Sequence, residues 1–335
     1  MMKNILITGA SGFIGSFLVE EALKRNYRVF AAVRSSSNRT YLSDPRINFI
    51  ETELSDKALL AEKFTTHQKT FGKFDFVIHN AGITKSCVKS DFDKVNFQYT
   101  KNLIEALTET ASLSGKFVFM SSLAAYGPGD EETLKPVSDS DTPHPVTLYG
   151  ESKLKAERYI KSLSGFPFLI FRPTGAYGYR EKDFYLVYKN IKQGVETYIG
   201  TTRQHLTFIY VKDLVRLIFD ALESPVAGKS YFVSDLNYYT ATEFNTIIKK
   251  VLRKKTIRII FPRTIVKIVA FLTEKIACIT KVPPTLNTEK YKEISCKNWL
   301  CDSTPLVNDF GFYPEYDLIK GLTETLTWYK NKNML

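Results

Sequence analysis

The chain contains little cysteine. Among its 335 residues are four, Cys87, Cys278, Cys296 and Cys301, and their spacing matches no metal-ligand pattern. The short interval between Cys296 and Cys301 has no second cysteine pair to complete a zinc site. We therefore expect no metal site. Unpaired, reduced thiols are typical of the cytoplasm, which is the compartment we predict.

Long hydrophobic runs are also missing. Ile5-Leu6-Ile7 stops at a glycine turn, and no basic stretch leads into an apolar one, so we expect no signal peptide. The segment from Pro262 to Lys281 has apolar residues at helical spacing, but charges exclude a transmembrane segment: Arg263, Lys267, Glu274 and Lys275. We interpret it as an amphipathic helix packed on the protein. Peripheral membrane contact and a gate for a hydrophobic substrate are the alternatives.

The charge is unbalanced, with 46 Lys or Arg against 35 Asp or Glu and a formal net charge of +11. Part of the excess lies in Lys249-Lys250-Val251-Leu252-Arg253-Lys254-Lys255. Because no aromatic residues interleave this run to stack on bases, we expect no nucleic-acid partner. A solvated helix end is the simpler interpretation, and attraction of phosphorylated ligands or anionic lipid is the alternative.

Strand-like and helix-like runs alternate through the first half of the chain. This alternation predicts an α/β fold, a Rossmann doubly wound parallel sheet with right-handed crossovers. The expected strands are Ile5 to Thr8, Val29 to Val33, Ile47 to Glu51, Phe76 to His79, Lys116 to Met120 and Phe168 to Phe171. We predict a dinucleotide-binding domain over residues 1–178. Residues 179–335 form mainly a smaller substrate lobe, with 206–234 returning to the first domain.

A glycine-rich turn follows the first expected strand. Gly9-Ala10-Ser11-Gly12-Phe13-Ile14-Gly15 precedes residues whose apolar positions recur at helical spacing, so the order is strand, tight turn and helix. Missing Cβ atoms let the backbone approach a pyrophosphate, whose charge the helix N-terminus favours. We expect Gly9, Ser11, Gly12, Phe13, Ile14 and Gly15 to bind the cofactor. Such a turn alone also occurs for structural reasons.

A tyrosine and a lysine four residues apart supply the chemistry. On a helix, Tyr149 and Lys153 lie one turn apart on the same face, so that phenol and ammonium address one pocket. A nearby cation lowers the pKa of a phenol from about 10, which makes it useful as an acid and base. Ser122 is placed to hydrogen-bond the substrate oxygen. The three residues predict proton transfer coupled to hydride transfer.

These motifs resemble the extended short-chain dehydrogenase/reductase superfamily, also described as the NAD-dependent epimerase/dehydratase family. The resemblance covers nearly the whole chain. Within that superfamily, the motifs most resemble those of the dihydroflavonol reductase and 3β-hydroxysteroid dehydrogenase branches. Beyond the glycine turn and Tyr149-Gly150-Glu151-Ser152-Lys153, the matching segments are His79-Asn80-Ala81-Gly82, Val95-Asn96-Phe97, Ser121-Ser122-Leu123-Ala124-Ala125-Tyr126-Gly127, Arg172-Pro173-Thr174-Gly175 and Phe208-Ile209-Tyr210-Val211-Lys212-Asp213.

The resemblance implies roles for individual residues. Ser122, rather than Ser121, aligns with the catalytic serine or threonine of the family, and Lys153 also binds the nicotinamide ribose. The further cofactor contacts implied are Asn80, Ala81, Gly82, Asn96, Tyr149 and Pro173. In the related family two helices, here about 93–110 and 149–163, pair with their copies in a second subunit. A homodimer is therefore implied.

The cofactor is predicted from the end of the second strand. An NAD-selective site usually has Asp or Glu there to accept from the ribose 2′-hydroxyl, but this chain has Arg34, followed by Ser35-Ser36-Ser37. A guanidinium and hydroxyl donors suit a 2′-phosphate, which favours NADP over NAD. The alternative is that Arg34 stacks on adenine and selects neither dinucleotide.

Several positions bear on the substrate, a small molecule. Nucleotide-sugar members of the family carry Arg-Asp where this chain has Leu206 and Thr207, and dehydratases carry Asp-Glu where it has Leu123 and Ala124. Arg203, Arg180 or Lys182 would have to replace the missing cation. Residues 127–145, rich in Asp, Glu, Pro and Ser, form an expected surface loop and a candidate lid.

The sequence thus predicts an NAD(P)-dependent oxidoreductase, with NADP preferred, that interconverts a secondary alcohol and a ketone. Its substrate would be like those of dihydroflavonol reductases or hydroxysteroid dehydrogenases. A nucleotide-sugar 4-epimerase with tightly bound NAD uses the same three catalytic residues and is the alternative. A non-catalytic dinucleotide sensor is a third reading, against which the intact Ser122, Tyr149 and Lys153 argue.

Overall fold

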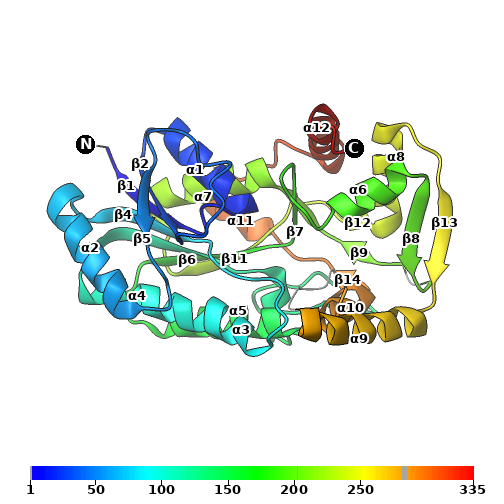
Figure 1. The fold of residues 1–335 in the computed structure, drawn as a ribbon, viewed down its shortest axis with the longest axis horizontal. Helices are drawn as coiled ribbons and strands as arrows, with labels where there is room; N and C mark the ends of the chain where they lie inside the picture. Colours follow the sequence, from blue (N-terminus) through cyan, green and yellow to red (C-terminus); the bar gives the residue numbers. More distant parts are fainter. Residues whose placement is uncertain (1, 202, 281–285) are drawn as a thin grey trace.

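A seven-stranded parallel sheet forms the centre of the computed structural model, which describes residues 2–201, 203–280 and 286–335 (Figure 1). The strand order is β11-β6-β5-β4-β1-β2-β3. This confirms the predicted α/β fold. The strands are β1 (Asn4–Thr8), β2 (Arg28–Val33), β3 (Asn48–Glu51), β4 (Phe74–His79), β5 (Leu113–Met120), β6 (Phe168–Pro173) and β11 (Lys229–Val233).

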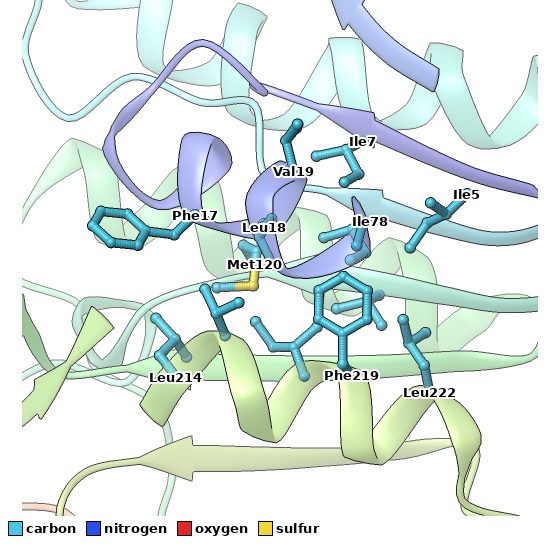
Figure 2. Packing of buried hydrophobic residues seen from close by; sticks show 14 of the residues in the cluster. Ile5, Ile7, Phe17, Leu18, Val19, Ile78, Met120, Leu214, Phe219 and Leu222 are labelled. Carbon is cyan, nitrogen blue, oxygen red and sulfur yellow. The ribbon is translucent and has the colours of Figure 1, made fainter. Parts of the chain in front are cut away.

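Helices cover both faces of the sheet. Figure 1 shows α1 (Phe13–Lys24) and α7 (Val211–Glu223) on one side, and α2 (Lys57–Phe71), α4 (Tyr99–Glu109) and α5 (Leu148–Ser162) on the other. Every residue of β1 is buried, as expected for a strand covered on both faces. Figure 2 shows the core on the first side, where Leu18 of α1 and Phe219 of α7 meet Ile78 of β4.

The order of the strands reverses between β1 and β4, and this reversal positions the site. β1 pairs with β2 on one edge and with β4 on the other, and Thr8 lies opposite His79. The chain leaves these two neighbouring strands toward opposite faces of the sheet. Ligands of open α/β sheets bind in the crevice that such a divergence creates at the carboxyl ends of the strands.

The second lobe is built from short strands and helices beyond residue 179. Its core contains Tyr188, Phe208, Phe244 and Leu322. Its elements are α6 (Tyr185–Lys192), β8 (Val195–Ile199), β9 (His205–Leu206), β12 (Tyr239–Thr240), α8 (Ala241–Leu252), β13 (Ile257–Phe261), α9 (Arg263–Thr280), α10 (Thr288–Ser295), β14 (Asn298–Trp299) and α12 (Leu318–Asn331). Two strands, β7 (Gly175–Tyr177) and β10 (Phe208–Tyr210), pair between the two parts.

Part of the C-terminal half belongs to the sheet domain. α7 packs on α1, and β11 extends the sheet beside β6. Further along the chain, α11 (Thr304–Phe310) contacts both α7 and β11.

The loop 127–145 is fastened to the segment around β14. The N–H of Val137 donates to the carbonyl of Leu300 at 2.9 Å, and the N–H of Asp302 donates back to Val137 at 2.9 Å. The side chain of Asn298 donates to the carbonyls of Asp130 and Lys135. These bonds hold the loop against the segment around β14 on both sides of its middle.

The helix predicted over Pro262 to Lys281 forms as α9, apart from Lys281, which lies outside the described residues. Its packing is not the one expected. The small or short side chains of Val266, Ala270 and Ala277 are buried, whereas the large ones face solvent: Ile265, Ile268, Phe271, Leu272, Ile276 and Ile279 are 50–84% exposed. The apolar face that we expected to pack on the lobe is therefore largely uncovered.

Candidate active site

The glycine turn brings the exits of β1 and β4 into contact. Gly9 has a φ of +64°, and a Cβ atom there would lie 2.7 Å from the backbone nitrogen of Ala81. A Cβ at Gly15 would lie 2.0 Å from the carbonyl oxygen of Gly9. Only glycine at position 15 therefore lets α1 approach the turn so closely. The turn is closed by the N–H of Gly12, which donates to Gly9 at 3.0 Å.

The start of α1 is suited to an anion. Gly12 is the N-cap residue and supplies no side-chain acceptor, and the first turn contains no Asp or Glu. The N–H groups beginning at Phe13 and Ile14 therefore have no side-chain cap, and the helix dipole adds positive potential there. This backbone cradle fits the pyrophosphate of a dinucleotide. Ser11, half-buried beside it, completes the segment expected to bind the cofactor.

A second polar feature suits the far end of such a ligand. The hydroxyl oxygen of Thr52, which follows β3, is buried and has no hydrogen-bond partner among the described residues. An unpaired buried hydroxyl is costly unless a ligand pairs with it. Thr52 directly follows β3, at the same carboxyl-end edge of the parallel sheet as the glycine turn. The cradle and Thr52 together fit the dinucleotide that the sequence implies.

Asn96 ties the loop after β4 to the helix that carries Tyr149. It is fully buried in a π-helical turn, η1 (Lys94–Gln98). Its side-chain oxygen accepts from the N–H of Ile83 at 2.8 Å, and its amide donates to Ile83 and to Ser152, each at 3.0 Å. In the same loop Asn80 donates to the carbonyl of Gly9 at 3.4 Å. Asn96 therefore links the loop after β4 to α5 through hydrogen bonds at both ends.

Lys153 lies beneath this loop. It is 3% exposed, and its ammonium donates to the carbonyl of Met120 at 2.7 Å. A Cβ at Gly82 would lie 3.2 Å from the Lys153 nitrogen, so the missing side chain permits the lysine to reach the loop. Burial lowers the pKa of Lys153 to about 8, and the charge of Glu157 opposes that shift. Gly82, Asn96 and Lys153, predicted separately, therefore lie together.

Close packing brings Tyr149 to Ser122. Tyr149 is the second residue of α5, and Ser122 caps η2 (Leu123–Ala125), directly after β5. A Cβ at Gly150 would lie 2.1 Å from the carbonyl oxygen of Ala124, so only glycine allows α5 to begin so near η2. The Ser122 hydroxyl accepts from the N–H of Ala124 at 3.2 Å and hydrogen-bonds the Tyr149 phenol.

The phenol of Tyr149 is a weak acid in this setting. Burial raises its pKa to about 12; the hydrogen bond with Ser122 lowers it, and the negative charge of Glu293 raises it. The sequence led us to expect Lys153 to lower this pKa. In the structure Ser122 is the group that does so, because the Lys153 ammonium is turned toward Met120. Tyr149 is thus protonated near neutral pH and can act as a proton donor.

Sequence reasoning missed the contribution of α10. Besides Glu293, whose charge reaches Tyr149, this helix contains Glu289, which accepts from the N–H of Leu148 at the start of α5. Lys290 donates to Glu293 at 2.9 Å. We had placed all of α10 in the substrate lobe without assigning any of its residues. No short-range pattern could have done so, because α10 and Tyr149 are about 140 residues apart in the chain.

Ser121 and Ser122 differ in their environment. The Ser121 hydroxyl is buried and donates to Glu157 at 2.5 Å, whereas Ser122 contacts the phenol. Glu157 in turn forms a buried ion pair with Arg172 of β6. The guanidinium makes 3.0 and 2.7 Å hydrogen bonds to this carboxylate and a 2.6 Å bond to Asp139. Arg172 is completely buried and Glu157 nearly so.

The remaining predicted positions are separated from this cluster. Arg34 is exposed after β2, and its backbone N–H donates to the hydroxyl of Ser37 at 3.0 Å. Pro173 ends β6 and is buried. Of the suggested replacement cations, Arg180 donates to Ser16 and Glu20 of α1, so it is engaged on the cofactor domain rather than in the lobe.

Two absences concern the described part of the chain. No three His, Cys, Asp or Glu side chains there gather into a group that could hold a metal ion. Among the helices described, none combines the length and apolar character that crossing a membrane requires.

Known proteins resemble this chain in sequence and in fold. Residues 5–234 match the model of the NAD dependent epimerase/dehydratase family. The chain is 26% identical to an N-acetyl-alpha-D-glucosaminyl-diphospho-ditrans,octacis-undecaprenol 4-epimerase of Escherichia coli O157:H7, over 98% of this chain and 96% of that protein. It is 23% identical to a ceramide reductase of Caulobacter vibrioides, over 97% and 94% of the two chains.

Among solved structures, the fold is similar to that of a UDP-glucose 4-epimerase from Thermotoga maritima, crystallised with UDP-glucose. The TM-score is 0.80, the sequence identity is 20%, and the alignment covers 98% of this chain and 99% of that one. At this identity the likeness concerns the fold alone.

Proposed function

The chain belongs to the NAD-dependent epimerase/dehydratase family and is an enzyme, and we propose that it moves a hydride reversibly at a secondary carbinol carbon of a diphosphate-linked sugar, as a 4-epimerase. The observation that carries this proposal is the contact between Ser122 and a protonated Tyr149, beside a cradle suited to a pyrophosphate. The relatives named as epimerases support this over the simple ketone reductase that the sequence favoured.

The roles of the residues follow from their chemistry. When bound, the dinucleotide supplies the nicotinamide that takes up and returns the hydride. Tyr149, protonated near neutral pH, donates its proton to the oxygen of the keto sugar as that oxygen becomes an alkoxide, and takes it back in the reverse direction. Ser122 hydrogen-bonds the same oxygen. Lys153, with Asn96 and Gly82 around it, holds the ribose side of the pocket.

Dehydration is a poorer proposal for this site. Leu123 and Ala124 stand where the sequence of a dehydratase carries its acid and base, and both lie in η2, adjacent to Ser122. An apolar side chain and a methyl group cannot transfer the additional proton that elimination of water requires.

Reduction of a long-chain ketone is the second candidate. The relative named as a ceramide reductase aligns over nearly the whole chain. Leu206 stands where nucleotide-sugar enzymes carry an arginine, and it packs against the aromatic core of the lobe. An uncharged residue at this position suits a substrate without a diphosphate.

Ligand-dependent melting and product analysis separate the two candidates. The protein, saturated with NAD⁺, is incubated with UDP-glucose and UDP-N-acetylglucosamine, and the C4 epimer is sought by proton NMR. Epimer formation, abolished in Tyr149→Phe and retained in a control at the exposed Tyr313, Tyr313→Phe, supports the epimerase. UDP at 100 times its dissociation constant would also add about 2.7 kcal/mol to stability. No epimer and no shift, with NADPH oxidation on a long-chain ketone, would establish the reductase instead.

A further inference from the structure

We propose that β13 and α9 form a docking surface for a bilayer that contains anionic lipid. The two elements follow each other in the chain, and Figure 1 shows them at one end of the molecule, remote from α2. Most of their exposed side chains are apolar, and the others include several Lys and Arg. We call residues 257–279 the apolar end face.

The apolar end face is unusually uncovered. All five residues of β13 are exposed, and Ile257 is 73% exposed. β13 pairs with β8 alone among the described strands, in a two-stranded sheet. On α9, exposed apolar residues at positions 265, 268, 269, 272, 276 and 279 recur at helical spacing, and Phe271 is exposed as well. A contiguous surface of this kind marks an interaction site in a folded protein.

α9 has two apolar sides with different side chains. One side is narrow and carries Val266, Ala270 and Ala277, which are buried. The side toward solvent carries the large residues, among them Leu272 and Ile276. With 18 residues α9 is about 27 Å long, so it can lie along a membrane surface with one side bound to protein and the other inserted among acyl chains.

The residues around the apolar end face are mostly basic, which favours an anionic partner. Residues 249–279 contain nine Lys or Arg and one Asp or Glu, Glu274. Glu274 is already engaged with the hydroxyl and N–H of Thr288. Lys267 and Lys275 lie on α9 beside the exposed apolar positions, and Arg258 lies within β13 over the ring of Tyr198. Basic residues flanking an inserted apolar stripe attract anionic lipid headgroups.

A second copy of the chain is a poorer occupant. A symmetric dimer places the same surface of each protomer against the other, so the basic border would meet a basic border. Like charges brought together in this way oppose association. An anionic bilayer accepts the apolar residues and the cations together.

The face is connected to the catalytic residues through α10. Glu274 of α9 accepts from Thr288, the first residue of α10, and Glu289 of α10 accepts from the N–H of Leu148, next to Tyr149. α10 therefore lies between the docking surface and the phenol. A protein docked through α9 would hold its active site close to the membrane surface, where a lipid-borne substrate is presented.

The test is co-flotation of the full chain with vesicles. We expect it to float with phosphatidylcholine vesicles containing 30% phosphatidylglycerol at 0.1 M NaCl, and to be released at 0.5 M NaCl or with phosphatidylcholine alone. Ile268→Ser/Leu272→Ser/Ile276→Ser should reduce the bound fraction at least tenfold. The control Ile319→Ser replaces an equally exposed residue of α12 and should bind as the unmodified protein does.

A charge-reversed pair keeps the test independent of folding defects. Lys267→Glu/Lys275→Glu should lose binding to anionic vesicles, whereas Lys63→Glu/Lys69→Glu on the exposed side of α2 should not. Circular dichroism and melting temperature show that each variant is folded. Vesicle binding that is unchanged in both α9 variants overturns the proposal. An absence of vesicle binding by the unmodified protein also overturns it. In that case, if the unmodified protein sediments as a dimer and the serine variant as a monomer, the occupant of the face is a second copy of the chain.

Discussion

The Glu289 carboxylate accepts a 2.6 Å hydrogen bond from the backbone N–H of Leu148, 141 residues earlier in the chain. Leu148 begins the helix whose second residue is Tyr149, so α10 fixes the N-terminus on which the phenol stands. A carboxylate at this place also interacts favourably with the helix dipole. The lobe that is expected to bind substrate is thus hydrogen-bonded to the helix turn that carries Tyr149.

Replacing Glu289 by Ala should weaken both folding and catalysis. Loss of a hydrogen bond to a charged group costs about 1.5–3 kcal/mol, and Tyr149 loses a support for its position. We expect a lower free energy of unfolding in urea and a lower kcat. Glu62→Ala, at an exposed position of α2, is the control and should change neither. An unaltered kcat in Glu289→Ala would show that α10 does not position Tyr149.

The two neighbouring serines should respond differently. Ser122→Ala removes the hydroxyl that contacts the phenol, and kcat should fall about 100-fold while the melting temperature stays near its original value. Ser121→Ala removes a buried hydrogen bond to Glu157, so it should lower stability by about 2 kcal/mol with a smaller effect on kcat. The reverse pattern would assign catalysis to Ser121.

Activity should decline as the pH rises through about 8. Burial lowers the pKa of Lys153 to about that value, so the ammonium is present below pH 8 and is lost above it. A neutral lysine no longer attracts the oxygens of the ribose or stabilises developing negative charge in the pocket. The measurement is kcat/KM between pH 6.5 and 10, with melting curves at each pH. An increase in kcat/KM through this range would mean that the neutral lysine is the active form.

Stability should decrease in mild acid because His79 is buried and uncharged. It lies between the hydroxyls of Thr8 and Thr100, and burial lowers its pKa to about 3, with Lys153 adding to the shift. Below pH 6.5 His79 therefore binds a proton in the unfolded chain but stays neutral in the folded chain. The free energy of unfolding should fall by about 1.4 kcal/mol per pH unit from this residue, until the pH approaches 3.

Urea denaturation at pH 7.5, 6.0 and 5.0 measures this slope. His79→Gln retains a hydrogen-bonding side chain but cannot take up the proton, so its slope should be smaller by one proton. His144→Gln, at an exposed position, should keep the full slope of the unmodified protein. Equal slopes in all three proteins would contradict the assignment to His79. His67, whose pKa burial lowers to about 4, contributes in the same direction.

Arg34 remains the predicted determinant of NADP binding. Arg34→Ser should raise the KM for NADP about 10- to 100-fold through loss of a charge-assisted contact with the 2′-phosphate, and should leave the KM for NAD almost unchanged. Arg39→Ser is a matched control, because that guanidinium already pairs with Glu51 and lies over the ring of Phe49. Equal KM values for NADP before and after the change would remove Arg34 from cofactor selection.

The sheet and much of the site were accessible from the sequence because their signals are local. Alternating apolar runs predict parallel strands, and the spacing of Tyr149 and Lys153 places them on one side of a helix. The orientation of α9 was not accessible. Both of its sides are apolar, and periodicity does not say whether Ala270 or Leu272 faces the protein. The approach of Glu289 and Glu293 to α5 depends on the tertiary fold and has no local signature.

The direction in which Lys153 points was also beyond the sequence. Helical spacing locates its Cα but not the long side chain, which the carbonyl of Met120 binds. The same is true of the pKa of Tyr149, since the cation that would lower it and the burial that raises it depend on distances within the pocket.

The buried pair of Glu157 and Arg172 restricts how this site can change by mutation. Losing either partner alone strands a charge in the interior and costs about 3–5 kcal/mol, a large part of the stability of a typical domain. An uncharged pair of similar volume is often tolerated at such a place, but every route to it by single substitutions passes through one of those weakened intermediates. Ser121 and Asp139 also hydrogen-bond this pair and are therefore restricted in the same way. We expect positions 121, 139, 157 and 172 to vary together or not at all.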